Sequence, residues 1–233
     1  MNNYFIRSKN LQESFLFILP LLVLYEIGII LYGSEVKNAA DVFVKSPLAV
    51  FGKDAALIFN SLVVFFSFCS LFYIEKRNRF NCRIFIPMFL ESIIYAFLLG
   101  YGLLFLVYRF LPLASTGIGT KGLAGGIIIS LGAGVYEEIF FRLLLLSGLC
   151  FIFIKAGRLS HFLGTFLGIA VSAAVFSAMH YIGATSDCFS THSFLFRFMA
   201  GIILATIFAV RGLGIVVYTH AVYDVLVVLR VNT

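Results

Sequence analysis

Long apolar stretches are the feature of this sequence that most limits what the chain can fold into. About 20 apolar residues let a helix cross a bilayer, and seven stretches have about that length or more. Lipid offers the backbone no hydrogen-bond partners, and the alternation of a β-barrel is absent, so helices are expected. The sequence therefore predicts an all-α, polytopic transmembrane bundle of about seven helices. The stretches are residues 15–32, 55–74, 84–106, 123–154, 162–182, 194–210 and 213–229.

The composition excludes the soluble classes of protein. The 233-residue chain is 61% hydrophobic and only 12% charged, whereas an average soluble domain is about 25% charged. The net charge of +6 lies between the apolar stretches rather than on one face. Basic loops that contact anionic lipid headgroups explain this charge better than a nucleic-acid partner does. The lipid bilayer is therefore the expected partner, and no nucleic acid is expected.

Three details of the bundle are less regular. Residues 123–154 would form a helix of roughly 48 Å, which is longer than one crossing needs, so it should tilt, project from the bilayer or break near its glycines. Only Arg211 and Gly212 separate the last two stretches, which predicts a tight helical hairpin. Residues 35–50 mix charged and apolar side chains and leave room for an eighth, short helix at the interface. Residues 1–233 are expected to form a single integral-membrane domain.

Ionisable residues stranded within the apolar stretches are the candidates for function. A charge at bilayer depth costs at least ~2.5–3.5 kcal/mol, so such a residue usually has a partner or a function. Most of them belong to the last four stretches, and this clustering points to a site in the second half of the chain. The candidates are Glu26, Glu91, Glu137, Glu138, Arg142, His180, His220 and Asp224.

The segment from Glu137 to Arg142 reads E-E-x-x-x-R. Residues four apart share a helical face, so Glu138 is expected to pair with Arg142. Glu137 is turned about 100° away and lacks that partner, which leaves it suited to act as a general base. The alternative is a buried Glu–Arg bridge that only holds two helices together.

Two further motifs follow. The first, F-x-x-x-H, runs from Phe176 to His180, and the second, H-x-x-x-D, runs from His220 to Asp224. Each motif alone also fits a structural role, as a core histidine with its hydrogen bonds satisfied or as a packing tether. Three unrelated tethers would not be expected in one half of so apolar a chain, so together the motifs favour a catalytic site.

E-E-x-x-x-R, F-x-x-x-H and H-x-x-x-D in this order on successive membrane helices resemble the CPBP family. Its members are CAAX proteases and bacteriocin-processing (Abi) enzymes, which are intramembrane glutamic proteases. The resemblance covers about residues 123–229. It implies a peptide hydrolase that acts on a membrane-associated or exported protein or peptide, without a cofactor or metal, in a bacterial plasma membrane.

The resemblance also implies a role for each motif residue. Glu137 would activate the attacking water, and His180 would assist it. His220 and Asp224 would stabilise the oxyanion of the tetrahedral intermediate. The eukaryotic prenyl-protein proteases of the family carry Asn where this chain has Asp224. Because an ionised Asp would repel an oxyanion, this residue is expected either to be protonated or to orient His220, and its presence points away from a prenyl-CAAX substrate.

Supporting roles are implied for Glu138, Arg142 and Phe176. For catalysis, Glu137, His180 and His220 should converge on one water-accessible cavity. Small residues permit close approach of membrane helices, and residues 122–126 and 164–168 each have Gly at both ends.

Other functions remain open at this stage. Glu137, His180 and His220 would also suit a metal-dependent protease, as a site of two histidines and one carboxylate. Intramembrane Glu and His residues also serve as proton relays in transporters. A non-catalytic protein, such as a bacteriocin-immunity factor, would keep the same motifs as scaffold.

Overall fold

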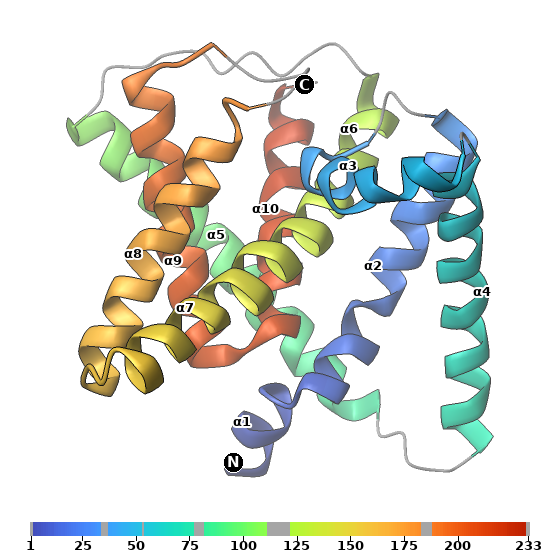
Figure 1. Cartoon of the computed structure of the whole chain (residues 1–233), viewed down its shortest axis with the longest axis horizontal. Coiled ribbons are helices and arrows are strands. Elements are labelled where there is room, and N and C mark those ends of the chain that lie inside the picture. The colour runs from blue at the N-terminus through green and yellow to red at the C-terminus, as the bar shows by residue number, and fades with distance from the viewer. Residues whose placement is uncertain are drawn as a thin grey trace.

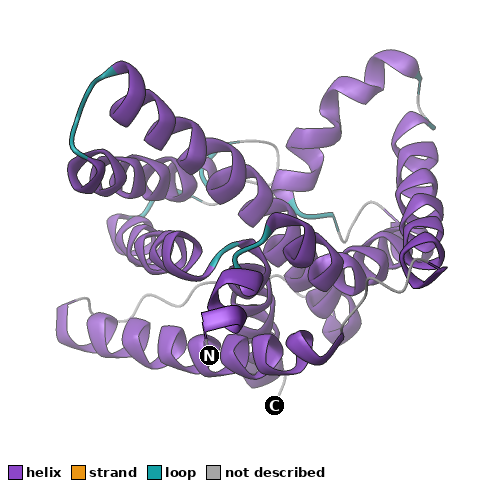
Figure 2. Cartoon of the chain, turned by 90° about the horizontal axis from the view of Figure 1, so that it is seen from below, coloured by secondary structure: helices purple, strands orange, loops and turns teal. Residues whose placement is uncertain are grey.

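The chain is helical through nearly all of the residues that the computed structural model describes, namely 2–33, 37–52, 54–76, 82–110, 122–182 and 188–231. Figure 2 shows the described residues as helices, with short loops between some of them. The α-helices are α1 (Asn2–Ser8), α2 (Leu11–Tyr32), α3 (Ala39–Lys45), α4 (Ala55–Lys76), α5 (Phe85–Phe110), α6 (Gly122–Gly132), α7 (Ser147–Phe151), α8 (His161–Met179), α9 (Thr191–Arg211) and α10 (Leu213–Val231) (Figure 1).

Six helices of the described chain are long and apolar enough to cross a bilayer, so the protein is a multi-pass membrane protein, as predicted. The remaining predicted stretch forms α4, whose described apolar part, Ala55–Ser67, is shorter. The six spans are Leu11–Tyr32, Phe85–Phe105, Gly122–Ala156, His161–Met179, Thr191–Arg211 and Leu213–Val231.

The long fourth stretch does not break at its glycines but forms one continuous helical span, Gly122–Ala156. It changes its winding instead. A π-helical segment, Ala133–Leu146, follows α6, and a second one, Ile152–Ala156, follows α7. Wider π turns are uncommon and often mark functional positions. The first of them, called the π segment below, contains the whole E-E-x-x-x-R motif.

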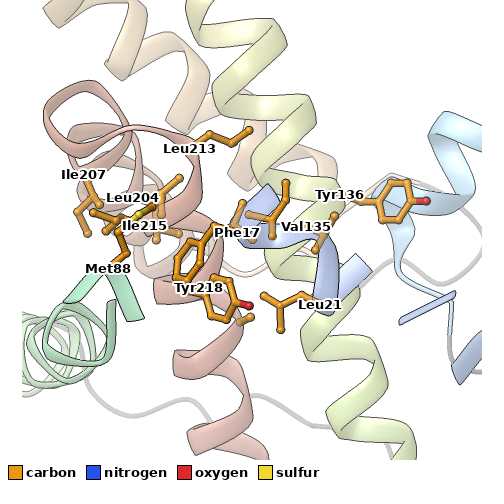
Figure 3. Packing of buried hydrophobic residues seen from close by; sticks show 14 of the residues in the cluster. Phe17, Leu21, Met88, Val135, Tyr136, Leu204, Ile207, Leu213, Ile215 and Tyr218 are labelled. Carbon is orange, nitrogen blue, oxygen red and sulfur yellow. The ribbon is translucent and has the colours of Figure 1, made fainter. Parts of the chain in front are cut away.

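Helix α10 runs through the centre of the bundle (Figure 1). It packs against α2, α5, α6, α9 and the π segment. Figure 3 shows the apolar core around its first half, where the ring of Tyr218 stacks on Phe17 of α2 at 4.2 Å between centroids. Burial of its first half, Leu213–Ala221, explains why this half is mostly apolar and why the one histidine of the helix lies inside the protein.

The predicted tight hairpin joins α9 to α10. Helix α9 ends at Arg211, Gly212 adopts a φ of +88°, and α10 begins at Leu213. A side chain at this φ would be strained, so glycine permits the turn.

The π segment and α10 approach each other closely at Gly134. A Cβ at this position would lie 2.6 Å from Cβ of Ala221 and 2.8 Å from the carbonyl oxygen of Val217. Only glycine fits there, and the contact brings the π segment directly against α10. The predicted glycine pairs behave differently from one another. Gly164 and Gly168 both pack closely on the preceding helix. In the first pair, a Cβ on Gly126 would lie 2.7 Å from Val228 of α10, whereas one on Gly122 would meet no neighbour within 4 Å.

A short helix lies where an eighth one was expected. Within residues 35–50, α3 covers Ala39–Lys45 and begins after the N-cap Asn38, and a 3-10 helix, Ser46–Phe51, follows it. Residues 34–36 lie outside the described residues. Helix α3 contacts the π segment, where the rings of Phe43 and Phe140 meet edge to face at 5.3 Å.

Candidate active site

Glu138 lies at the centre of the candidate site and is completely buried. Its Oε1 atom is 3.1 Å from a terminal nitrogen of Arg142, which lies four residues further along the same segment. The same oxygen is 2.6 Å from Nδ1 of His220 on α10. The predicted Glu138–Arg142 pair is therefore present. Glu138 also joins the first and the third sequence motifs directly, a contact that the sequence did not predict.

His220 lies between two carboxylates. Its Nδ1 faces Glu138, and its Nε2 is 3.5 Å from Oδ2 of Asp224, one turn further along α10. The second distance is too long for a good hydrogen bond. The predicted His220–Asp224 neighbourhood is present, but the short hydrogen bond of the imidazole goes to Glu138. Within the described part of the chain, the Nε2 atom therefore makes no short hydrogen bond.

Glu137 is the neighbour of Glu138 in the chain and has a different environment. Its side chain is buried, with an exposed fraction of 7%, and Oε1 accepts a hydrogen bond of 2.9 Å from Nδ2 of Asn38. The sequence predicted no partner for Glu137. The structure gives it a neutral donor from the N-terminal half, and no cation among the described residues forms an ion pair with the carboxylate.

The ring of Phe176, on α8, packs against several residues of the site. It meets the rings of Phe141, His180 and His220 edge to face, with centroids 5.2, 5.0 and 6.3 Å away. The guanidinium of Arg142 lies over the same ring at 4.5 Å. An aromatic face stabilises a cation placed in this way. Phe176 thus touches members of all three motifs.

His180 caps the C-terminal end of α8. Its Nδ1 is 2.9 Å from the carbonyl oxygen of Phe176, and the side chain is half-buried. A carbonyl oxygen only accepts, so Nδ1 carries the proton, and Nε2 of the neutral ring is left as an acceptor. Among the described residues, the contact that links His180 to the other motifs is the ring of Phe176, and no hydrogen bond joins it to Glu137.

Helix α8 is held against the π segment by a side-chain bond. The hydroxyl of Ser172 donates to the carbonyl oxygen of Phe141 at 2.8 Å. In an α-helix that carbonyl would be bonded four residues ahead, whereas a π winding changes the backbone pairing. This bond fixes the depth at which Phe176 and His180 meet the π segment.

The two remaining stranded carboxylates of the sequence lie in separate clusters. Glu91 of α5 binds Arg211 at 2.5 and 2.8 Å and accepts from the hydroxyl of Tyr4. Glu26 of α2 accepts from Lys45 of α3 at 3.0 and 3.1 Å. Both carboxylates are paired with cations, which explains their presence in apolar stretches without a catalytic role.

The cluster around Glu26 borders the site. Its carboxylate also accepts a hydrogen bond from the hydroxyl of Tyr136, the residue before Glu137. Lys45 contacts Asp41 at 2.5 Å as well. The sequence showed Glu26 as a stranded charge, but α3, which supplies Lys45, Asp41 and Asn38, carried no recognisable motif. The first half of the chain therefore contributes to the site through contacts and not through a motif.

The geometry bears on the metal-site interpretation. In the described part of the chain, no three His, Cys, Asp or Glu side chains come together as a group that could hold a metal ion. This part includes Glu137, His180 and His220, the ligands which that interpretation requires.

Comparison with known families agrees with the site. Residues 119–226 match the sequence model of the family described as type II CAAX prenyl endopeptidase Rce1-like. The matched region covers a little less than half of the chain and contains all three motifs. Together with the membrane-spanning helices, it defines a membrane protease, that is, a peptide hydrolase. The match agrees with the resemblance of this region to the CPBP family of CAAX proteases. Among curated proteins and among solved structures, nothing matches the chain.

Proposed function

We propose that this protein is an intramembrane glutamic endopeptidase that cleaves a membrane-associated or exported protein or peptide. The observation that carries the proposal is the buried contact between Glu138 and His220, with Glu137 directly beside it and held by a neutral donor. Peptide hydrolysis needs a base that reaches a water and donors aimed at the developing oxyanion. The first need is met by Glu137 and the second by His220.

In the proposed reaction, Glu137 takes a proton from a water molecule, and the resulting hydroxide attacks the carbonyl carbon of the scissile peptide bond. The carbonyl π electrons move to oxygen and form the tetrahedral oxyanion. The proton held by Glu137 then passes to the leaving nitrogen, directly or through Nε2 of His180. As the oxyanion re-forms the carbonyl, the C–N bond breaks and releases an amine and a carboxylic acid.

The oxyanion would be stabilised by His220 in its imidazolium form. Nδ1–H donates to Glu138 at 2.6 Å, so a second proton, on Nε2, is needed for donation to the oxyanion. Two carboxylates, Glu138 and Asp224, flank the ring and favour this charged form. Asp224 is therefore proposed to orient and charge His220 and not to bind the oxyanion itself, which accounts for Asp at a position where the eukaryotic family members carry Asn.

The substrate class is tested by comparing protein termini in cells. Membranes of a bacterial host expressing the wild-type chain are compared with membranes of the same host expressing Glu137→Gln, by proteomics of N- and C-terminal peptides. New termini in exported or membrane proteins are expected with the wild type alone. The same termini with both chains would contradict the proposal. We place the protein in a bacterial plasma membrane, the compartment in which these substrates are sought.

The mechanism is separated from metal catalysis by a chelator. The purified wild-type protein is incubated with EDTA or 1,10-phenanthroline and assayed on a peptide that spans the cleavage site found in cells. Full activity is expected in both cases because the described His, Cys, Asp and Glu residues form no three-ligand group. Loss of activity that Zn²⁺ restores would favour the metal-dependent mechanism.

A further inference from the structure

Asn38 uses every polar group it has to connect three parts of the protein. Its side-chain oxygen accepts from the backbone N–H of Ala40 at 2.8 Å and so caps α3. Its side-chain nitrogen donates to Oε1 of Glu137 at 2.9 Å. Its own backbone N–H donates to the hydroxyl of Tyr25 at 3.0 Å. The side chain is buried at the place where α2, α3 and the π segment meet.

The contacts fix which way the amide points. The N–H of Ala40 is a donor, so the oxygen of Asn38 must face it, and the NH₂ group must then face Glu137. Ser, Thr and Asp cap helices about as well as Asn does. Asp has no donor for a carboxylate, and Ser and Thr have a single hydroxyl, whereas Asn offers its acceptor to the helix and its donor to the carboxylate on separate atoms. The choice of asparagine is thus explained by Glu137 and not by the needs of α3.

The position of Asn38 is itself fixed by buried charges. Lys45, at the other end of α3, contacts Glu26 of α2 at 3.0 Å and Asp41 at 2.5 Å, and all three side chains are almost completely buried. Separating these charges inside the protein is costly. Helix α3 therefore presents Asn38 to Glu137 from a rigid support.

We infer that Asn38 is a positioning residue that holds one carboxylate oxygen of Glu137 so that the other oxygen faces the attacking water. This inference rests on the proposed function, in which Glu137 is the general base. A base that rotates freely about its last torsion would offer its proton-accepting oxygen in the wrong direction for part of the time. Misplacement by about 1 Å can lower a rate by on the order of 10².

Two substitutions remove the amide donor and keep the cap. Asn38→Ser and Asn38→Asp both leave an oxygen for the N–H of Ala40. Asp has no donor for Glu137, and the hydroxyl of Ser lies one bond closer to the backbone than the amide nitrogen of Asn. The matched control is Asn10, which caps α2 through the same side-chain oxygen, with a hydrogen bond of 2.9 Å from the N–H of Gln12. In the described structure, the hydrogen bonds of Asn10 all go to residues 7–14, outside the candidate site, so Asn10→Ser and Asn10→Asp report the effect of changing a cap alone.

The variants are compared in proteoliposomes on the peptide that spans the cleavage site found in cells. We expect kcat to fall on the order of 100-fold in both Asn38 variants, with KM changed less than about threefold, and to stay near the wild-type value in both Asn10 variants. A higher KM with an unchanged kcat in the Asn38 variants would overturn the inference. Equal effects of the Asn38 and Asn10 substitutions would also overturn it.

A second measurement covers the case in which a variant is unstable or the cell experiment finds no substrate. The infrared carboxylate stretch of Glu137 is assigned by its absence in Glu137→Gln. We expect this band to shift in Asn38→Ser and to stay in place in Asn10→Ser, and an unshifted band in Asn38→Ser overturns the inference.

The kinetic outcomes also separate the proposed function from the positioning role of Asn38. Activity in Glu137→Gln would refute the proposed function, whereas an inactive Glu137→Gln beside a fully active Asn38→Ser would refute the positioning role alone.

Discussion

The Nδ1 atom of His220 lies 2.6 Å from Oε1 of Glu138, and both side chains are buried. This contact ties α10 to the π segment at the level of the E-E-x-x-x-R motif. One carboxylate oxygen thereby serves both Arg142 and His220. The second glutamate of the motif thus joins two helical segments, and in the proposed mechanism the first, Glu137, acts on the water.

Replacement of Arg142 by Ala should destabilise the protein. The guanidinium is fully buried against Glu138 and over the ring of Phe176. Breaking a buried ion pair on one side costs roughly 3–5 kcal/mol, because it leaves the other charge buried without its partner. We expect a clearly lower thermal unfolding temperature in detergent together with loss of activity.

The control for this variant is Arg7→Ala. Arg7 contacts Glu13 at 2.6 Å, but both side chains are about a quarter exposed, and such surface pairs contribute only about 0–1 kcal/mol. An unfolding temperature for Arg142→Ala equal to that of Arg7→Ala would show that the buried pair does not hold the site together.

Substitutions of Asp224 test its proposed role as an orienting group for His220. The carboxylate lies 3.5 Å from Nε2 of the imidazole. Asp224→Asn keeps a polar neighbour for the imidazole and removes one of the two carboxylates that favour the imidazolium form, so kcat should fall by no more than about tenfold. Asp224→Leu removes the polar neighbour as well, and kcat should fall further, by on the order of 10². The two variants are compared on the same peptide at one pH. Equal activity of the two would contradict the orienting role.

Gly134→Ala should force the π segment away from α10. The added Cβ would lie within 3 Å of Ala221 and of the carbonyl oxygen of Val217, and backbone cannot yield as a flexible side chain can. Overpacking of this kind costs about 1–3 kcal/mol, and the displacement would also separate Glu138 from His220. Lower stability and lower kcat are expected together.

The matched control is Gly148→Ala in α7. A Cβ at Gly148 would meet nothing within 4 Å, and Ala is favoured over Gly in a helix by about 1 kcal/mol. This variant should unfold at or above the wild-type temperature with unchanged activity. If both glycine variants behaved alike, the close approach at Gly134 would not be what limits the helix spacing.

The sequence predicted those features that arise from local spacing or from transfer into lipid. The membrane spans followed from apolar length, and the Glu138–Arg142 pair followed from residues four apart on a helix. The hairpin at Gly212 followed from the short, polar interruption between two apolar stretches. In each case the physical cause lies within a few neighbouring residues.

The contacts that complete the site could not be predicted in this way. Glu138 meets His220 across 82 positions, and Asn38 meets Glu137 across 99. Such contacts depend on how whole helices pack, which one sequence does not reveal. The π winding of residues 133–146 also has no local signal, and the possibilities considered for the 32-residue stretch, a tilt, a projection from the bilayer or a break, did not include it.

The most direct test of the account is the rate of peptide cleavage by purified Glu137→Gln. The substitution keeps the size of the side chain and an oxygen for Asn38 but removes the base. Glu13→Gln, which changes a partly exposed carboxylate paired with Arg7, serves as the matched control. Both proteins are reconstituted in proteoliposomes at equal, folded concentration. We predict no measurable cleavage by Glu137→Gln and a wild-type rate for Glu13→Gln. Near-normal cleavage by Glu137→Gln would contradict the proposal that Glu137 is the general base.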